Sequence, residues 1–315
     1  MMKVLVTGCA GFIGSHLTDR LLKNGHKIIG IDNFNDYYDP KIKEGNLKQA
    51  LKNKKLKLYS EDILNYDNLE QIFKKEKPQE IVHLAARAGV RPSIEHPMVY
   101  VNANVLGTVN LLKLAVDFKV GQFIFGSSSS VYGNSKRLPF SENDPCDTII
   151  SPYGASKRSA EFWVETFWRV YGLKSIILRF FTVYGPRGRP DMAPSLFTRA
   201  IFDRKSIGQF GDGLSSRDYT YIDDIVEGIV KVLGSDLGFE IINLGNSHPV
   251  KLSEFIKVIE GVTGKKARIK YLSKQVGDVE KTWANIVKAN NLVGWQPKTF
   301  LPEGLAKYIK WLRAN

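Results

Sequence analysis

The chain has 315 residues and a formal net charge of +13 at pH 7, with 43% hydrophobic and 24% charged residues. This length predicts one large domain and a smaller one, and the composition is typical of a globular protein. No apolar run approaches the roughly 20 residues that span a bilayer, and the short apolar start, broken by glycines, is unlike a signal peptide.

The first predicted element is a buried parallel strand at residues 3–7. A turn containing Gly8, Gly11 and Gly14 follows, and leucines at helical spacing come next. Glycines let the backbone approach a phosphate, and the N–H groups and dipole of the helix N-terminus favour an anion. Together these elements predict a site for a dinucleotide pyrophosphate, whereas the glycine spacing taken alone is equally typical of a tight structural turn.

A second predicted strand at residues 27–31 ends at Asp32. A carboxylate at this place binds the 2′-hydroxyl of a ribose and repels a 2′-phosphate. The next residues are Asn33 and Phe34, with no arginine to receive that phosphate. The sequence therefore predicts NAD rather than NADP.

Further compact apolar runs alternate with amphipathic stretches, which predicts right-handed βαβ units and an α/β fold with a doubly wound parallel (Rossmann) sheet. From about Pro186 the pattern becomes irregular and ends in an amphipathic helix at residues 302–313. We expect residues 1–185 to bind the cofactor and residues 186–315 mainly to bind the substrate, although the chain can cross back to the sheet. Polar and small residues gather at the expected carboxyl ends of the strands, where ligands bind in such folds: Gly8, Asp32, Asp62, Ala86, residues 127–130 and Thr182.

Tyr153 and Lys157 are four residues apart in a predicted helix and share one face of it. A phenol has a pKa of about 10, and a nearby ammonium lowers it, so this pair predicts a general acid/base. Taken alone, the same spacing is also typical of a surface cation–π pair.

The cysteines, histidines and lysine-rich segments predict no further site. The only cysteines are Cys9, in the glycine-rich turn, and Cys146, so we expect no structural disulfide and a reducing cytoplasm. No Cys/His cluster has metal-ligand spacing, and no metal is expected. The lysines at residues 48–57 and 74–77 do not interleave with aromatic residues, so we interpret them as exposed surface charge and expect neither nucleic acid nor membrane as a partner.

Several segments together resemble the extended short-chain dehydrogenase/reductase superfamily, over essentially the whole chain. They are residues 7–14, Asp62-Ile63, residues 83–86, residues 127–133, Tyr153 with Lys157, residues 179–181, residues 184–186 and residues 217–224. The resemblance implies tight NAD binding, a nucleotide-sugar substrate held by the C-terminal portion, and a homodimer formed through helices that include the one carrying Tyr153.

The resemblance also implies roles for individual residues. Tyr153, Lys157 and Ser128 would be catalytic, and Ser130 would face the sugar as well. The cofactor would be held by Gly8, Gly11, Phe12, Ile13, Gly14, Asp32, Asn33, Asp62, Ile63, Leu84, Ala85, Ala86, Tyr153 and Lys157.

The two residues before Val131 separate the chemistries of this superfamily. Nucleotide-sugar dehydratases carry Asp-Glu there, and glucuronate decarboxylases carry a Glu, which assists a step after the 4-keto intermediate has formed. This chain has Ser129 and Ser130. Lacking the acid, the site is expected to oxidise C4 and return the hydride, which is epimerisation.

Three stretches, at residues 32–40, 88–93 and 182–193, resemble UDP-glucuronate 4-epimerases. Arg189 is a candidate donor to the sugar carboxylate or else a surface residue, Arg217 is expected at the diphosphate, and Gln209 with Phe210 along the uracil. Arg87 and Pro92 depart from the family pattern. UDP-glucose or UDP-N-acetylglucosamine 4-epimerisation and net NAD-dependent oxidoreduction remain alternatives. The expected substrate contacts are Ser128, Ser130, Thr182, Arg189, Gln209, Phe210, Arg217 and Asp278.

Overall fold

The structure, a computed structural model, describes residues 1–273 and 279–314. The described chain divides into two compact units. Unit 1 comprises Met1–Gly133, Cys146–Arg179 and Val226–Ile242, and unit 2 comprises Asn134–Pro145, Phe180–Ile225 and Asn243–Asn315. The chain thus leaves unit 1 and returns to it, and each unit is described separately below.

Unit 1 is built on a seven-stranded sheet with the strand order β10-β6-β5-β4-β1-β2-β3. The pairs β1–β2, β2–β3, β1–β4 and β4–β5 are parallel. This order places β1 between β2 and β4, which is the switch point where doubly wound sheets bind ligands at their carboxyl ends. The strands are β1 (Lys3–Thr7), β2 (Lys27–Asp32), β3 (Leu56–Ser60), β4 (Glu80–His83), β5 (Gln122–Ser128), β6 (Ser175–Phe180) and β10 (Phe239–Leu244).

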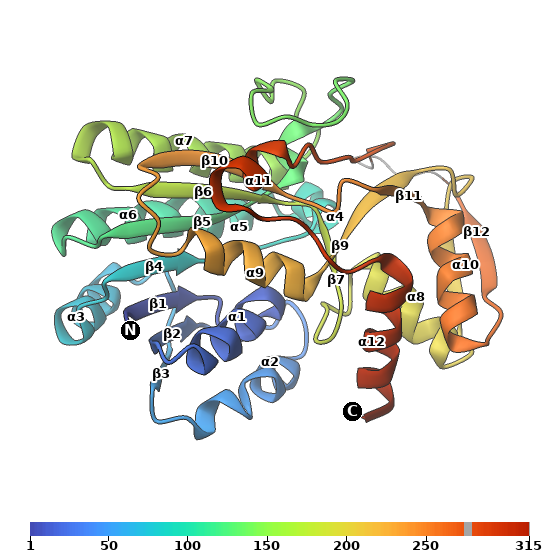
Figure 1. The fold of residues 1–315 in the computed structure, drawn as a ribbon, viewed down its shortest axis with the longest axis horizontal. Coiled ribbons are helices and arrows are strands. Elements are labelled where there is room, and N and C mark those ends of the chain that lie inside the picture. The colour runs from blue at the N-terminus through green and yellow to red at the C-terminus, as the bar shows by residue number, and fades with distance from the viewer. Residues whose placement is uncertain (274–278, 315) are drawn as a thin grey trace. The chain divides into compact units, whose positions relative to one another are not determined.

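Helices cover both faces of this sheet (Figure 1). Apolar side chains of α3, α6 and α7 form one core with alternate residues of the strands, among them Leu5, Phe123 and Phe125. On the opposite face α1 and α9 are joined by an ion pair between Arg20 and Glu227 at 2.8 Å. The helices are α1 (Phe12–Lys23), α2 (Pro40–Leu47), η1 (Ala50–Lys52), α3 (Tyr66–Glu76), α4 (Val90–Glu95), α5 (Pro97–Tyr100), η2 (Val101–Leu106), α6 (Gly107–Asp117), η3 (Ser129–Tyr132), α7 (Pro152–Tyr171) and α9 (Ile222–Val232). The α/β fold with a doubly wound parallel sheet is therefore confirmed.

Unit 2 contains two small sheets, β11-β9-β7 and β12-β8. Strand β7 runs parallel to β9, whereas β11 runs antiparallel to it. The elements are β7 (Thr182–Tyr184), α8 (Ala193–Phe202), β8 (Ser206–Phe210), β9 (Ser216–Tyr221), β11 (Pro249–Lys251), α10 (Leu252–Thr263), β12 (Arg268–Leu272), α11 (Val287–Val293) and α12 (Leu301–Ala314). The sequence pattern of this region is irregular up to the last helix, because its strands are short and separated by turns, so their periodicity is weak.

One helical stretch differs from the expectation that no long apolar run exists. Within the described residues, Pro97–Asp117 is long and apolar enough to cross a membrane by length and composition alone. A helix in the core of a globular domain passes the same test. Here the stretch comprises α5, η2 and α6, and four apolar side chains of α6 belong to the core of unit 1.

Candidate active site

The glycine-rich turn between β1 and α1 is tightly folded. Gly8 has φ of +68°, a conformation that other residues rarely adopt, and a Cβ on Gly14 would lie 2.0 Å from the Gly8 carbonyl oxygen. Gly11 precedes α1 and has no side chain to cap it, so the first N–H groups of the helix can face an anion. The turn therefore has the backbone geometry of a phosphate-binding loop.

Asp32 ends β2 beside this loop, and its carboxylate is 6% exposed. The backbone N–H groups of Ala10 and Phe34 donate to its two oxygens at 3.1 and 3.0 Å. Lys43 of α2 lies 3.7 Å from Oδ1; burial lowers the pKa of Lys43, while the charge of Asp32 acts in the opposite direction. Sequence reasoning missed Lys43, because only the packing of α2 brings it to the end of β2.

Other predicted cofactor residues meet at the carboxyl ends of neighbouring strands. Asn33 donates to the Asp62 carboxylate at 2.8 Å. The N–H of Ala85 donates to the Thr7 hydroxyl at 3.2 Å, and a Cβ on Gly8 would lie 2.7 Å from that same nitrogen. The loops after β1, β2, β3 and β4 are thus linked along one edge of the sheet.

Tyr153 lies in the first turn of α7, which Ser151 caps by accepting from the Gly154 N–H at 3.0 Å. The backbone N–H of Tyr153 donates to the Ser93 hydroxyl at 3.1 Å. Its ring meets the ring of Tyr100 edge to face, with the centroids 6.1 Å apart. These contacts fix the position of Tyr153 at the start of the helix.

Lys157 lies one turn further along α7 and is 3% exposed. Its Nζ donates to the Gly126 carbonyl of β5 at 2.7 Å. Burial lowers the pKa of Lys157 to about 7, and the charge of Glu161 partly opposes this. The ammonium is therefore held between the tyrosine-bearing helix and the sheet, where its charge is weakly screened.

The serine cluster follows directly from β5. Ser128 is the last residue of the strand, and its hydroxyl accepts from the Ser130 N–H and donates to the Ser130 hydroxyl, both at 3.2 Å. A Cβ on Gly154 would lie 2.6 Å from the Ser130 carbonyl oxygen, so the first turn of α7 lies against this cluster. The structure thus brings Ser128 and Ser130 into the neighbourhood of Tyr153, as expected for a shared site.

Asn104 is a residue that no sequence motif singled out. It lies in η2, a π-helical turn, and its amide donates to the Arg87 carbonyl and the Ser156 hydroxyl, both at 2.9 Å. It also accepts from the Arg87 N–H at 2.7 Å, and the Arg87 guanidinium stacks 4.3 Å from the Tyr37 ring centre. A single π turn leaves no periodic signal in a sequence, although such turns are frequent at functional sites.

His83 is bonded on both sides of its ring, which gives it a structural role. The ring nitrogens contact the hydroxyls of Thr7 and Thr108 at 2.7 and 3.0 Å. Burial, and then the charge of Lys157, lower the pKa of His83 to about 3, so the ring is neutral at physiological pH. Among the described residues, no group of three or more His, Cys, Asp or Glu could hold a metal ion.

The expected substrate residues of unit 2 lie on its small sheets and their loops. Thr182 pairs with Tyr219 in the β7–β9 ladder, two positions from Arg217. Arg189 forms an ion pair with Asp191 at 2.5 Å. Gln209 of β8 is buried and donates to the Gly211 carbonyl at 3.4 Å, and Phe210 follows it in the strand.

Asp218, beside Arg217, lies in the motif at residues 217–224, from which no role was predicted for it, and it is fully buried. Its oxygens accept from the backbone N–H groups of Asn246 and Ala284 at 2.6 and 2.9 Å. Burial raises the pKa of Asp218 to about 6. The expected substrate contact Asp278 lies outside the described residues.

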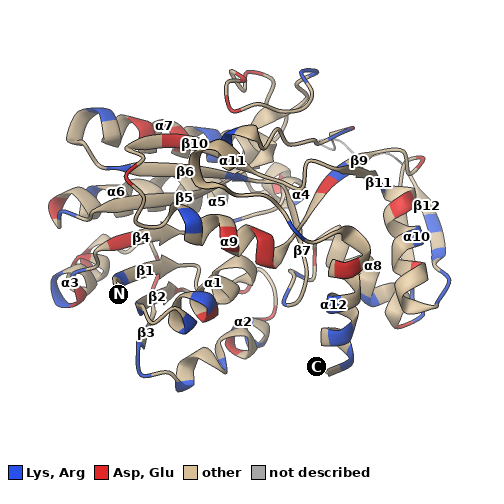
Figure 2. Cartoon of the chain, viewed as in Figure 1, with Lys and Arg blue, Asp and Glu red and all other residues tan. Residues whose placement is uncertain are grey.

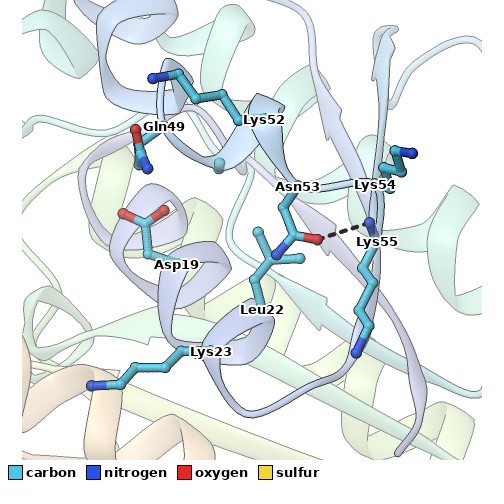
Figure 3. A pocket seen from close by; sticks show the side chains of 9 residues that line it. Asp19, Leu22, Lys23, Gln49, Lys52, Asn53, Lys54 and Lys55 are labelled. Carbon is cyan, nitrogen blue, oxygen red and sulfur yellow. Dashed lines mark hydrogen bonds between the residues drawn. The ribbon is translucent and has the colours of Figure 1, made fainter.

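Lysines and arginines are spread over the chain (Figure 2). The lysines within residues 48–57 and 74–77 are exposed. One surface hollow of about 710 Å³ lies on unit 1 and has four lysines on its rim (Figure 3). None of the expected site residues lines this hollow. Its lining residues are Asp19, Leu22, Lys23, Gln49, Ala50, Lys52, Asn53, Lys54 and Lys55.

A Rossmann sheet with a glycine-rich phosphate loop, an acid at the end of β2 and a Tyr-Lys pair beside a serine cluster define an extended short-chain dehydrogenase/reductase. The family model described as GDP-mannose 4,6 dehydratase matches residues 5–308. The chain belongs to this family, within the extended short-chain dehydrogenases/reductases.

Relatives of this chain include several epimerases. A UDP-glucuronate 4-epimerase of Thermodesulfobacterium geofontis is 45% identical, over 99% of this chain and 96% of the relative. The crystal structure of UDP-glucuronic acid 4-epimerase from Bacillus cereus, in complex with UDP-glucuronic acid and NAD, has a TM-score of 0.94 at 37% identity and covers 99% of both chains. A UDP-glucose 4-epimerase from Thermotoga maritima with UDP-glucose has a TM-score of 0.92 at 34% identity, again over 99% of both chains.

Proposed function

We propose that this protein is an NAD-dependent isomerase that inverts C4 of a UDP-sugar, converting UDP-glucuronate to UDP-galacturonate through a transient 4-keto intermediate. The observation that carries this proposal is the pairing of Tyr153 and Lys157 with a serine cluster that has no carboxylate next to Val131. The 45% identical UDP-glucuronate 4-epimerase and the similar Bacillus cereus structure support the sugar and the cofactor.

The glycine turn fits NAD. A Cβ on Gly14 would collide with the Gly8 carbonyl oxygen, so glycine permits the tight turn that presents backbone N–H groups to a pyrophosphate. Asp32, fixed by two backbone N–H groups, would accept hydrogen bonds from the ribose hydroxyls. Other contacts would come from the loops after the strands, namely Gly11, Phe12, Ile13, Asn33, Asp62, Ile63, Leu84, Ala85 and Ala86.

The proposed mechanism assigns one task to each catalytic side chain. NAD, when bound, accepts a hydride from C4 and returns it to the opposite face. Tyr153, as phenolate, takes the proton of the 4′-hydroxyl and later gives it back. Lys157 favours the phenolate through its positive charge and binds the nicotinamide ribose, while Ser128 hydrogen-bonds the reacting oxygen. Inversion then requires that the 4-keto sugar present its other face before the hydride returns.

The proposed substrate contacts are the residues that the family resemblance implies. Arg217 would bind the diphosphate, Gln209 and Phe210 would lie along the uracil, and Ser130 with Thr182 would contact the sugar. A 4-keto glucuronate is a β-keto acid, and donors that hold its carboxylate in the ring plane would hinder loss of carbon dioxide. Arg189 already pairs with Asp191, so the sugar carboxylate would have to share that guanidinium. Asp278 remains a candidate contact.

A homodimer in the cytoplasm completes the proposal. Phe162 and Trp163 of α7 are 54% and 42% exposed, which suits an interface formed by this helix. Both cysteines are buried, in accord with a reducing compartment. Analytical ultracentrifugation with Phe162→Glu tests the interface: a wild type that sediments as a monomer contradicts it.

The test of function is an NMR assay with UDP-glucuronate, UDP-glucose and UDP-N-acetylglucosamine in parallel. We expect UDP-galacturonate from UDP-glucuronate, without net change of absorbance at 340 nm, and a loss of at least about 10²-fold in kcat for Tyr153→Phe because general acid/base catalysis contributes that much. Tyr271→Phe, at an exposed tyrosine, is the matched control. Turnover of another sugar alone reassigns the substrate, stoichiometric NADH identifies a net oxidoreductase, and full activity of Tyr153→Phe contradicts the mechanism.

A further inference from the structure

Next to Lys157, unit 1 contains a buried ionic cluster, formed by Glu161 and its hydrogen-bond partners, that has no part in the proposed mechanism. Glu161 lies one turn after Lys157 on the same face of α7, so Tyr153, Lys157 and Glu161 follow one another along that face. Its side chain is fully buried. A carboxylate in such a place is costly unless it is paired and hydrogen-bonded, so its partners identify its task.

Four hydrogen bonds converge on the Glu161 carboxylate. Arg179 of β6 donates from Nε to Oε1 at 2.9 Å and from Nη2 to Oε2 at 2.8 Å, as a bidentate pair. Ser127 of β5 donates to Oε1 at 2.6 Å, and Arg158 of α7 donates to Oε2 at 2.9 Å. The carboxylate thus ties α7 to two central strands of the sheet, directly beside the strand residue that accepts from Lys157.

The neighbouring geometry links this cluster to Lys157. Gly126, whose carbonyl accepts from Lys157, and Ser127, which donates to Glu161, are consecutive in β5. A shift of α7 along the sheet would therefore break both bonds together. In the sequence Ser127 is only a serine at a strand end; in the structure its hydroxyl is buried beneath α7 and belongs to the cluster.

Charge gives Glu161 a second effect on Lys157. Burial alone would raise the pKa of Glu161, but the charge of Arg179 and the hydrogen bonds from Arg179 and Ser127 outweigh it and leave the carboxyl ionised. Lys157 itself interacts electrostatically with Glu161 of α7 and His83 of β4, and Tyr153 lies one turn before it on α7. Arg158 of α7 and Arg179 of β6 pair with Glu161. Tyr132 of η3 and Cys146 act in turn on Arg179. Glu161 is the one carboxylate among these described groups.

We propose that Glu161 is a positioning residue for catalysis, which holds Lys157 at the Gly126 carbonyl and keeps its ammonium protonated. The proposal rests on the proposed function only in that Lys157 must be cationic to support Tyr153. Arg179 is buried and Arg158 is partly exposed, and both pair with Glu161. Without Glu161, these two guanidinium groups would have no carboxylate beside Lys157, and the ammonium would lose its proton at lower pH.

The test is a direct titration of Lys157 in the holoenzyme, followed by the Cε and Nζ chemical shifts of lysine-labelled protein. The resonance of Lys157 is identified by its absence in Lys157→Met. For Glu161→Gln we expect the midpoint to fall by about one pH unit, because one nearby opposite charge is removed. For Arg158→Gln we expect it to rise by a few tenths to about one pH unit, because a cation is removed. Glu165→Gln, at the surface partner of Arg169 on the same helix, should leave it unchanged.

The opposite directions separate this role from simple structural support. The proposal is overturned if the midpoint of the Lys157 titration moves in the same direction in Glu161→Gln and Arg158→Gln, or if it stays unchanged in both. If Glu161→Gln does not fold, Arg158→Gln decides alone: a rise supports the proposal, and no change or a fall overturns it. Where turnover is measured, the alkaline limb of the kcat profile should move with the midpoint. If the wild type turns over none of the three UDP-sugars, the proposed function fails, yet the titration still decides whether Glu161 controls the protonation of Lys157.

Discussion

Replacing Lys157 by methionine should raise the stability of the protein at neutral pH while abolishing activity. The side chain is 3% exposed, and burial lowers the pKa of its ammonium from 10.5 to about 7. Between these two pH values the unfolded chain binds the proton and the folded chain does not, so the stability of the wild type rises with pH in this window. The free energy of unfolding of the wild type therefore decreases as the pH falls from 10.5 towards 7.

The magnitude follows from the shift of the pKa. At 1.36 kcal/mol per pKa unit, Lys157 makes the NAD-free wild type about 3 kcal/mol less stable at pH 7 than at pH 9.5. Lys157→Met removes this dependence. Relative to an uncharged side chain, the lowered pKa of Lys157 costs about 4 kcal/mol of stability at pH 7, and the substitution removes all of this cost. It also leaves the Gly126 carbonyl without its donor, which costs about 1–3 kcal/mol, so the net gain at pH 7 is roughly 1–3 kcal/mol.

The assay is urea unfolding of the NAD-free proteins, followed by circular dichroism from pH 7 to 9.5. Lys23→Met, at an exposed lysine of α1, is the control and should keep the pH dependence of the wild type. If Lys157→Met shows the same slope of stability against pH as the wild type, the ammonium is not strained by burial and the reasoning is wrong.

Two further substitutions test the glycine-rich cofactor loop and the backbone segments of unit 2 that the Asp218 carboxylate holds. Gly14→Ala should abolish NAD binding in a fluorescence titration, because its Cβ would lie 2.0 Å from the Gly8 carbonyl oxygen. The control Gly45→Ala, in open space on α2, should bind NAD normally and gain about 0.5–1 kcal/mol of stability. Normal NAD affinity of Gly14→Ala would contradict the assignment of the glycine turn as the phosphate-binding loop. Asp218→Asn keeps one acceptor oxygen and turns a donor towards a backbone N–H, so we expect a loss of about 1–3 kcal/mol, seen as faster hydrogen exchange at Asn246 and Ala284. Asp212→Asn, which is exposed, should leave exchange at these amides unchanged, and equal effects of the two would show that Asp218 does not hold these segments.

The parts of the site that the sequence predicted are those fixed by short-range patterns. An apolar run followed by spaced glycines predicts β1, the phosphate loop and α1, because the chain itself imposes these turns. The spacing of Tyr153 and Lys157 predicts a shared helical face from the pitch of a helix. The position of Asp32 at the end of β2 predicts that it lies at the cofactor site, because parallel strands all end at the same edge of the sheet.

Only the tertiary structure decided which distant residues support those groups. Glu161 meets Arg179 because α7 packs over β5 and β6, and no local pattern pairs them. Lys43 reaches Asp32 through the packing of α2, and Asn104 reaches Ser156 through a π turn. Hydrogen bonds and charge pairs of this kind depend on distances across the fold, whereas sequence periodicity reports only which side of each element is buried.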